Sequence, residues 1–257
     1  MISATDIQNS LKTKFVGQII HTFDVVDSTN TVAKHLADAG GPEGTTVIAD
    51  CQTDGRGRLN RQWYGEPGKG ILLSIILRPK KPDVSQILTY LAAVSAAEAV
   101  EEILGRPVEC KWPNDLLING RKFTGILIES SWRQSSVEHA VVGIGMNVNE
   151  EKFPLELRKK ATSLKIEFGH EVDRAVLICG ILQHLETNYL GCTAKGSGDV
   201  LDAWNKRCMM FGREITLDQS GRILTGKALR LDGDGALVIK DHDHEIKVFG
   251  GDVAVLN

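Results

Sequence analysis

Three arginines and two glycines are crowded into one short polar segment, residues 54–63. Arginine presents a planar fork of donors that matches phosphate or carboxylate oxygens two at a time. Gly55 and Gly57 carry no Cβ, so the backbone beside Arg56 and Arg58 can adopt positive φ and approach a ligand closely. These residue types predict a loop that wraps an anion. Considered alone, the segment fits a solvated basic turn equally well.

A second polar stretch, residues 111–115, reads Lys-Trp-Pro-Asn-Asp. The Asn119-Gly120 pair that follows is a strong signal for a tight hairpin turn between apolar runs. Residues 111–115 and 122–129 are therefore expected on neighbouring antiparallel strands, which brings two lysines, an amide and a carboxylate to one region of a sheet. A hairpin with charged flanks is the alternative. A central Trp-Pro-Asn-Asp is unusual for a purely structural strand, so the sequence favours a site.

Further polar residues stand at the ends of expected strands. Ser28, Thr29 and Asn30 are helix-capping types at a strand-to-helix junction, and locally a plain N-cap explains them better than contact with a ligand. Gln52 lies where a strand becomes the arginine loop, a common place for an amide that contacts a ligand. Trp63, at the far end of the loop, fits either core packing or stacking on a base.

Two glycines alternate in the apolar strand expected over residues 140–149, at Gly143 and Gly145. Such glycines indicate the close approach of a ligand or of another backbone. The pattern is not a complete dinucleotide-binding fingerprint, because Val148 stands where the third glycine should be. Residues 65–70 resemble a P-loop but lack its spacing and its Ser or Thr, so we expect a turn there.

Apolar periodicity and glycine stops predict four helices, over residues 31–39, 83–105, 173–191 and 199–212. In the second helix, Asp83 and Gln86 have the spacing of a capping box. The third helix is expected to bury a face that includes Val176 and Leu177.

From Arg213 onward the sequence changes to short alternating strands separated by glycine turns. This pattern predicts a small C-terminal β domain of the SH3-like barrel kind, with residues 1–211 and 212–257 as the two domains. The run Asp-His-Asp-His-Glu at residues 241–245 suggests a metal cluster, but a solvated hairpin tip explains it better because no further ligand has a fixed spacing.

The bulk composition excludes several classes of protein. The 257 residues are 42% hydrophobic and 25% charged, as in a globular protein, and the net charge of −3 argues against broad nucleic-acid binding. No apolar run approaches the roughly 20 residues needed to span a bilayer, and the N-terminus lacks the features of a secretory signal. The five scattered cysteines are typical of a reduced, cytoplasmic protein.

From about Asp27 to the C-terminus the sequence closely resembles the biotin protein ligases, the biotin–[acetyl-CoA-carboxylase] ligases. Five motifs carry the resemblance, and they occur in the order that the family shows. They are Ser28-Thr29-Asn30, Gln52 with Gly55-Arg56-Gly57-Arg58 and Trp63, the Lys-Trp-Pro-Asn-Asp stretch, Arg121-Lys122-Phe123-Thr124-Gly125-Ile126-Leu127, and Gly143-Ile144-Gly145-Met146-Asn147.

The resemblance implies an α+β fold with a mixed-sheet catalytic domain of the biotin/lipoate ligase type and a C-terminal SH3-like β-barrel. It implies that biotin and ATP form biotinyl-5′-AMP with the help of Mg²⁺. The biotinyl group then passes to one lysine of a biotin carboxyl carrier protein. A homodimer is compatible with the resemblance, which does not fix the oligomeric state.

Site residues follow from the resemblance position by position, with no metal site built by the protein itself. The implied catalytic residues are Arg58, Lys122 and Asp115, the last as candidate base of the transfer step. The residues implied to bind biotin are Ser28, Thr29, Asn30, Gln52, Gly55, Arg56, Gly57, Arg58, Lys122, Gly125, Leu127, Gly143 and Gly145. Those implied to bind ATP are Arg56, Arg58, Trp63, Lys111, Asn114 and Asn147. The loop departs from the family pattern at Asn60, where glycine is frequent, and asparagine tolerates left-handed backbone better than most residues.

Two alternatives remain within this resemblance. A lipoate–protein ligase shares the fold and the adenylate chemistry, but the Arg-Gly-Arg loop together with Lys-Trp-Pro-Asn-Asp favours biotin. A biotin-operon repressor carries an N-terminal helix-turn-helix domain of roughly sixty residues, a DNA-reading unit. Only 27 residues precede Ser28, so we expect no DNA binding.

Overall fold

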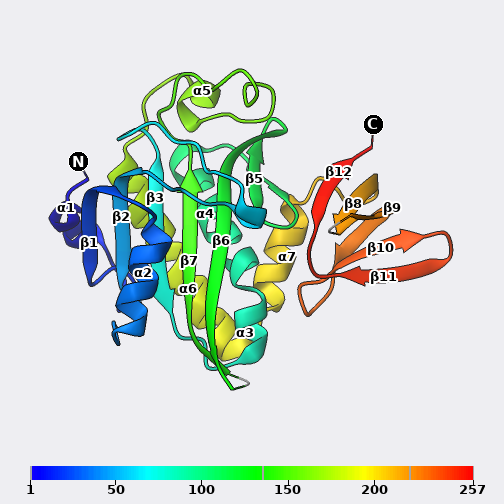
Figure 1. Cartoon of the computed structure of the whole chain (residues 1–257), viewed down its shortest axis with the longest axis horizontal. Coiled ribbons are helices and arrows are strands. Elements are labelled where there is room, and N and C mark those ends of the chain that lie inside the picture. Colours follow the sequence, from blue (N-terminus) through cyan, green and yellow to red (C-terminus); the bar gives the residue numbers. More distant parts are fainter. Residues whose placement is uncertain (1, 135, 220, 257) are drawn as a thin grey trace.

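The computed structural model describes residues 2–134, 136–219 and 221–256. Its centre is a seven-stranded sheet with the strand order β1-β2-β3-β7-β6-β5-β4, in which β1 and β2 are parallel and the other neighbours antiparallel (Figure 1). The strands are β1 (Ile20–Val26), β2 (Thr46–Gln52), β3 (Ile71–Leu77), β4 (Glu109–Lys111), β5 (Asp115–Ile118), β6 (Arg121–Arg133) and β7 (Ser136–Met146). The predicted mixed sheet is confirmed.

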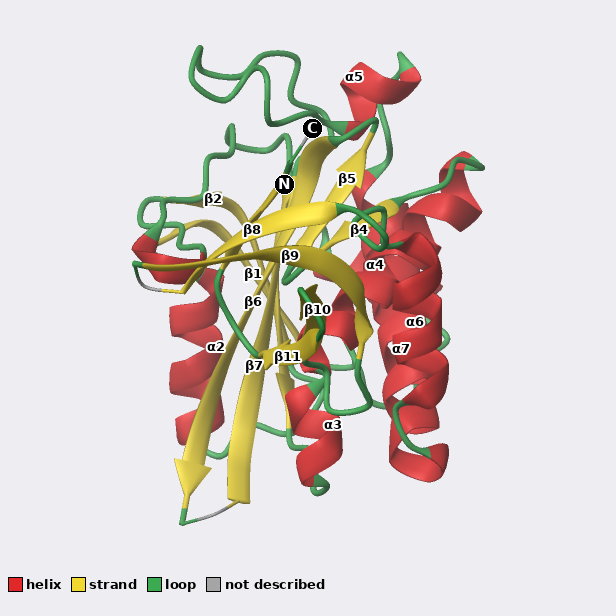
Figure 2. Ribbon diagram, turned by 90° about the vertical axis from the view of Figure 1, so that its right-hand side faces the viewer, coloured by secondary structure: helices red, strands yellow, loops and turns green. Residues whose placement is uncertain are grey.

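Helices cover the two faces of this sheet unequally. The helices are α1 (Ala4–Ser10), α2 (Thr29–Asp38), α3 (Pro82–Gln86), α4 (Leu88–Leu104), α5 (Leu164–Phe168), α6 (Arg174–Lys195) and α7 (Gly198–Arg207). Figure 2 shows α2 on one side of the sheet and α4, α6 and α7 on the other. The side of α4 and α6 holds the main core, whereas α2 covers only part of its own side with Ala33 and Ala37. The rest of that face is left for the loops.

Side chains of β3 point alternately to the two faces of the sheet, so this strand packs on both sides. All seven residues of β3 are buried, which suits a central strand covered on each side. Leu73 and Ile75 belong to the main core, whereas Ile76 packs with α2. Because successive side chains point to opposite faces, Leu72 and Ser74 lie on the same face as Ile76, under the loops.

A separate five-stranded antiparallel sheet follows α7, with the order β11-β10-β9-β8-β12, as expected for an SH3-like domain. Its strands are β8 (Glu214–Gln219), β9 (Arg222–Leu231), β10 (Leu237–Asp241), β11 (His244–Val248) and β12 (Asp252–Val255). The sheet lies beside α7, on the side of the seven-stranded sheet where β4 and β5 run (Figure 1). The division at residues 211 and 212 remains a prediction.

Several helix boundaries differ from those that the sequence predicts, and the first predicted helix begins at Thr29 and not at residue 31. The helix expected from Asp83 begins at Pro82, with Lys81 as N-cap, and breaks at Ile87, so it is two helices and has no capping box. Proline suits the first helical position because its missing N–H has no partner there in any case. The helix expected to stop at Gly191 continues to Lys195, because a glycine in a helix costs only about 1 kcal/mol and packing offsets this. The last helix ends at Arg207, short of Gly212.

One predicted core residue is wrong: Val176 on α6 is 52% exposed, whereas Leu177 beside it is fully buried. Val176 lies in the first turn of α6, which is capped by Asp173. None of the described helices is long and apolar enough to cross a membrane.

Glu150 is a fully buried carboxyl group in the segment that follows β7. The residue is 0% exposed, and among the described residues neither carboxyl oxygen makes a hydrogen bond of good geometry; the nearby backbone N–H groups of Val148 and Glu150 only partly offset the effect of burial on its pKa. Gly70 leaves room for it, since a Cβ at that position would lie 2.8 Å from Glu150 Oε1. Burial raises the pKa of Glu150 from 4.5 to about 7.

This shift predicts a fall in stability as the carboxyl group ionises. The folded protein holds the proton more tightly than the unfolded chain, so the free energy of unfolding decreases from a pH of about 4.5 to about 7 and then levels off. In Glu150→Gln we expect no such fall, and above a pH of about 7 the variant should exceed the wild type by up to about 3 kcal/mol. Denaturant unfolding at mildly acidic and mildly alkaline pH measures this, and a gap independent of pH would contradict it.

Candidate active site

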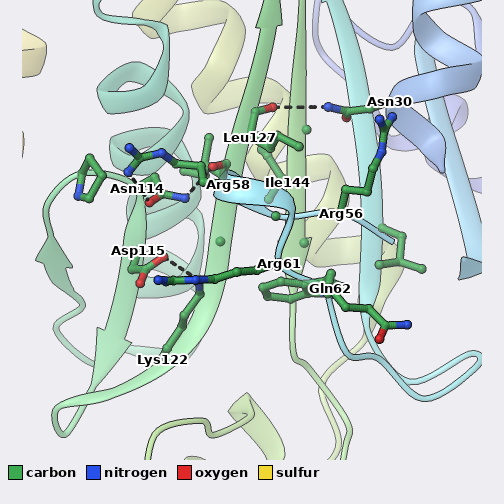
Figure 3. Close-up of a pocket in the computed structure, with 18 of the residues that line it drawn as sticks. Asn30, Arg56, Arg58, Arg61, Gln62, Asn114, Asp115, Lys122, Leu127 and Ile144 are labelled. Atoms are coloured by element: carbon green, nitrogen blue, oxygen red, sulfur yellow. Dashed lines mark hydrogen bonds and ion pairs between the residues drawn. The ribbon is translucent and has the colours of Figure 1, made fainter. Parts of the chain in front are cut away.

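A cavity of about 380 Å³ lies on the face of the seven-stranded sheet that α2 leaves open (Figure 3). The arginine loop covers it, and the ends of β2, α2 and β5 form its walls. Most of the residues predicted as a site line it. They are Ser28, Thr29, Asn30, Gln52, Arg56, Gly57, Arg58, Trp63, Lys111, Asn114, Asp115, Lys122, Gly125, Leu127, Gly143 and Gly145. Two predicted residues, Gly55 and Asn147, are outside this lining.

Strand register forms the floor of the cavity. One row across the sheet pairs Asp115 with Gly125, Gly125 with Gly145, and Gly145 with Leu72. Two residues further along β7, Gly143 pairs with Leu127 on one side and with Ser74 on the other. Because residues two apart in a strand face the same way, both rows point into the cavity.

The glycines in this floor are required by side chains that lie against them. A Cβ on Gly143 would be 2.2 Å from Asn30 Oδ1, and a Cβ on Gly145 would be 2.7 Å from the Trp63 indole. A Cβ on Gly125 would meet the same indole at 2.9 Å. The glycines therefore do allow a close approach to the strands, as predicted. In this structure the approaching groups are the side chains of Asn30 and Trp63, not a ligand or another backbone.

Neutral hydrogen-bonding groups gather at one end of the cavity. Gln52 Oε1 accepts hydrogen bonds from the backbone N–H of Thr29 at 2.7 Å and from its hydroxyl at 2.9 Å. The hydroxyl of Ser74 lies 2.7 Å from Thr29 Oγ1 and 2.6 Å from Asn30 Oδ1. Ser28 occupies the N-cap position as predicted, but its side chain makes no capping hydrogen bond. Its buried hydroxyl is thus left to face the cavity.

The other end carries positive charge. Lys122 Nζ pairs with Asp115 Oδ1 at 2.6 Å and lies 5.5 Å from the centre of a Trp63 ring. Arg58 Nη1 donates to Asn114 Oδ1 at 3.3 Å, and Asn114 Nδ2 donates to the backbone oxygen of Ile126 at 2.7 Å. Figure 3 shows these groups facing the cavity from β5, β6 and the loop. An anion between them would receive charge-assisted hydrogen bonds.

Arg56 is held on the outer side of the loop. Its Nη2 donates to Thr31 Oγ1 at 2.9 Å and lies 3.9 Å from Glu129 Oε1. Glu129 in turn accepts from Asn30 Nδ2 at 2.7 Å. The guanidinium thus rests between a hydroxyl and a carboxylate at the edge of the cavity (Figure 3).

The C-terminal domain also reaches the site. Asp252 and Val253 of β12 line the cavity, and Asp252 forms an ion pair with Arg61 of the loop. Arg61 belongs to the loop that the sequence predicts to wrap an anion, whereas Asp252, Ser74 and Glu129 were not predicted as site residues. Ser74 did leave a signal, because it is the lone hydroxyl in the apolar run of β3. Nothing local to Asp252 connects it to a loop almost two hundred residues earlier.

The two predicted residues outside the lining serve neighbouring structure. Asn147 Nδ2 donates to the backbone oxygen of Thr162 at 3.0 Å, which fixes the segment after β7. Gly55 is buried beside Gln52 and Trp63. Their predicted ligand contacts remain predictions.

No cluster of three or more His, Cys, Asp or Glu side chains suited to a metal is present among the described residues. At the cationic end, Asp115 and Asn114 supply one carboxylate and one amide oxygen. This donor set fits Mg²⁺, which is usually held by one or two carboxylates together with waters and substrate phosphates. These two oxygens are too few to hold a metal ion without ligands from the substrate or from water.

Comparisons with known proteins agree with this geometry. Residues 22–147 match the profile of the Biotin/lipoate A/B protein ligase family. The bifunctional ligase/repressor BirA of Bacillus subtilis is 38% identical over 98% of this chain and 78% of its own length. The chain belongs to the biotin/lipoate A/B protein ligase family. The biotin–[acetyl-CoA-carboxylase] ligase of Mycobacterium tuberculosis is 28% identical over 91% of this chain and 88% of its own length.

Solved structures of family members are similar as well. The biotin protein ligase from Aquifex aeolicus in complex with biotin and ATP matches with a TM-score of 0.82 and 29% identity, over 93% of this chain and 99% of that one. The predicted fold, a mixed-sheet ligase domain with a small C-terminal β domain, is thereby confirmed. That this ligase binds no DNA remains a prediction.

The contact between Gly143 and Asn30 yields a test of the cavity. Gly143→Ala should displace Asn30, since the new Cβ would lie 2.2 Å from Asn30 Oδ1. We expect biotin to bind about tenfold more weakly or worse, because overpacking a close contact costs about 1–3 kcal/mol. Calorimetric titration measures this. Gly191→Ala is the matched control, since its Cβ would meet nothing within 4 Å, and equal binding by both variants would refute the role of Gly143.

Proposed function

We propose that this ligase activates biotin with ATP to give biotinyl-5′-AMP and then transfers the biotinyl group to a lysine of a biotin carboxyl carrier domain. The observation that carries the proposal is one cavity with neutral hydrogen-bonding groups at one end and cationic groups at the other. Biotin has the same polarity, with a cyclic urea at one end and a carboxylate at the other. The likeness to a ligase in complex with biotin and ATP supports the proposal.

The neutral end suits the urea. The Ser28 hydroxyl has no capping bond, and the Gln52 amide nitrogen lies beside Gly55. Thr29 and Asn30 are held in place by Ser74, so their positions are fixed before a ligand arrives. Preorganised donors and acceptors bind a polar ring without the entropic cost of ordering the side chains.

The cationic end suits the reaction itself. The biotin carboxylate must attack the α-phosphate of ATP, so two anions have to be brought together before pyrophosphate can leave. Lys122 and Arg58 supply positive charge where these anions meet, and charge placed in advance stabilises the transition state. Mg²⁺, bound with the phosphates near Asp115 and Asn114, would neutralise the departing pyrophosphate.

The transfer step needs an acceptor amine without its proton. Asp115 is the proposed base, because its carboxylate lines the cavity and is about a quarter exposed, with 24% of its side chain accessible. Its pairing with Lys122 at 2.6 Å keeps it in the cationic half of the cavity, beside the activated acyl group. Loop residues Arg56 and Arg58 would then shield the mixed anhydride from water.

The acceptor is proposed to be the carrier domain of acetyl-CoA carboxylase, as in the names of the relatives. A cytoplasmic location is consistent with five free cysteines. A homodimer remains a prediction from the resemblance.

Mass spectrometry of a biotin carboxyl carrier domain tests the proposal directly. After incubation with the ligase, biotin, ATP and Mg²⁺, we expect the mass of one biotinyl group to be added to one lysine. Omission of ATP, or replacement of biotin by lipoate, should abolish the addition. Transfer of lipoate in place of biotin would overturn the choice of substrate.

Lys122→Ala should slow biotin-dependent exchange between pyrophosphate and ATP by about a hundredfold or more, because a charge aimed at the reacting anions is lost. Lys34→Ala is the control, since Lys34 is an exposed residue of α2 outside the cavity lining. Circular dichroism would verify that both variants fold. Exchange at the wild-type rate in a folded Lys122→Ala would exclude the assigned role.

A further inference from the structure

One hydroxyl group, that of Tyr90 on α4, joins the C-terminal domain to the wall of the active site. Tyr90 Oη donates to the backbone oxygen of Gly235 at 2.6 Å and accepts from Trp112 Nε1 at 2.9 Å. Gly235 lies in the turn between β9 and β10, whereas Trp112 directly precedes Pro113 and Asn114, which line the cavity. A single side chain therefore touches both domains.

The hydroxyl of Tyr90 lies in largely buried surroundings. Tyr90 is 6% exposed and Trp112 is 1% exposed, so water has little access to either polar group. The ring of Trp204 packs edge-on against Tyr90, with 5.4 Å between ring centroids. Burial raises the pKa of Tyr90 to about 12, so the hydroxyl keeps its proton and remains a donor to Gly235 near neutral pH.

The contact with Gly235 is also tight in shape. Gly235 has a φ of +79°, and a Cβ on it would lie 2.8 Å from Cε2 of the Tyr90 ring. Any residue with a Cβ at this position would clash with the ring of Tyr90, so the contact requires a glycine. A second cavity, of about 260 Å³, opens beside this contact and is lined by Tyr90, Gly235, Asn114 and Arg58. Asn114 and Arg58 belong to both cavities, which places the domain contact directly behind the cationic end of the site.

We propose that Tyr90 is a positioning residue, through which the seating of the C-terminal domain holds the Trp112–Asn114 segment, and with it Arg58, in the geometry that binds ATP. This inference rests on the proposed adenylation of biotin and adds a residue that does not touch either substrate. Loss of the hydroxyl leaves the indole N–H and the Gly235 oxygen unpaired and buried, so both sides of the contact relax. The neutral end of the cavity is held by Ser74 and Gln52 instead, so biotin binding is unaffected.

The test compares two tyrosines that are equally buried. Tyr90→Phe is expected to raise the KM for ATP in pyrophosphate exchange by about tenfold, with the KM for biotin unchanged. Tyr189→Phe is the matched control, because Tyr189 is also 6% exposed and its hydroxyl donates to Glu43 at 2.7 Å, away from the cavity. It should lower the melting temperature but leave both KM values unchanged.

Gly235→Ala tests the same contact from the side of the C-terminal domain. The substituted residue does not line the main cavity. It should raise the KM for ATP as Tyr90→Phe does, and the double variant should show much less than the product of the two effects. A Tyr90→Phe variant that loses stability like Tyr189→Phe, with the KM for ATP unchanged, would overturn the proposal. So would an equal rise in both KM values.

Amide hydrogen exchange separates this inference from the proposed function, because it needs no turnover. In Tyr90→Phe, exchange should quicken both at residues 232–236 and at residues 109–116, whereas Tyr189→Phe should leave both segments unchanged. Quickening at 232–236 alone would show that the two domains are not coupled through Tyr90. A wild-type protein without biotin-dependent pyrophosphate exchange would refute the proposed function and leave the amide result to decide the coupling.

Discussion

An excess of positive charge around one cavity is the constraint on which the rest of the structure depends. Five cationic side chains line the cavity, whereas two carboxylates do so, and those two are already paired with Lys122 and Arg61. Of the other three cations, Arg58 rests on the neutral amide of Asn114, whereas Arg56 donates to Thr31 and lies 3.9 Å from Glu129 Oε1 at the edge of the cavity. Like charges repel at this range, so an anion that enters the cavity relieves the repulsion among these side chains. A carboxylate and a triphosphate supply that anion together.

The scaffold supports this concentration of charge from both faces of the seven-stranded sheet. Beneath the loop, β6 and β7 have no side chains at Gly125, Gly143 and Gly145, so Trp63 and Asn30 can lie close against the sheet. On the opposite face, α4 and α6 pack the main hydrophobic core against the strands. The C-terminal domain contacts this site in two places. Asp252 contacts the arginine loop, and Gly235 lies behind the cationic end of the cavity.

Much of this could be predicted from the sequence, because the cationic and glycine residues occur in short local motifs with few structural uses. The Asn119-Gly120 turn followed from a local pattern, whereas the mixed sheet and most lining residues followed from the resemblance that these motifs carry. Ser74 and Asp252 did not, since their roles depend on register across the sheet and on contact between domains. Helix ends such as Gly191 were predicted wrongly for a related reason: tertiary packing outweighed a local preference of about 1 kcal/mol.

The most direct test of the charge constraint is the rate at which trypsin cuts the arginine loop after Arg56, Arg58 and Arg61. The backbone there adopts positive φ at Leu59 and Asn60, and Leu59 is 64% exposed, so the free loop is open to attack. We expect biotin with ATP to slow cleavage of the loop strongly, while cleavage elsewhere in the chain proceeds at its former rate. Equal loop cleavage with and without the ligands, at concentrations shown by titration to saturate the site, would contradict it.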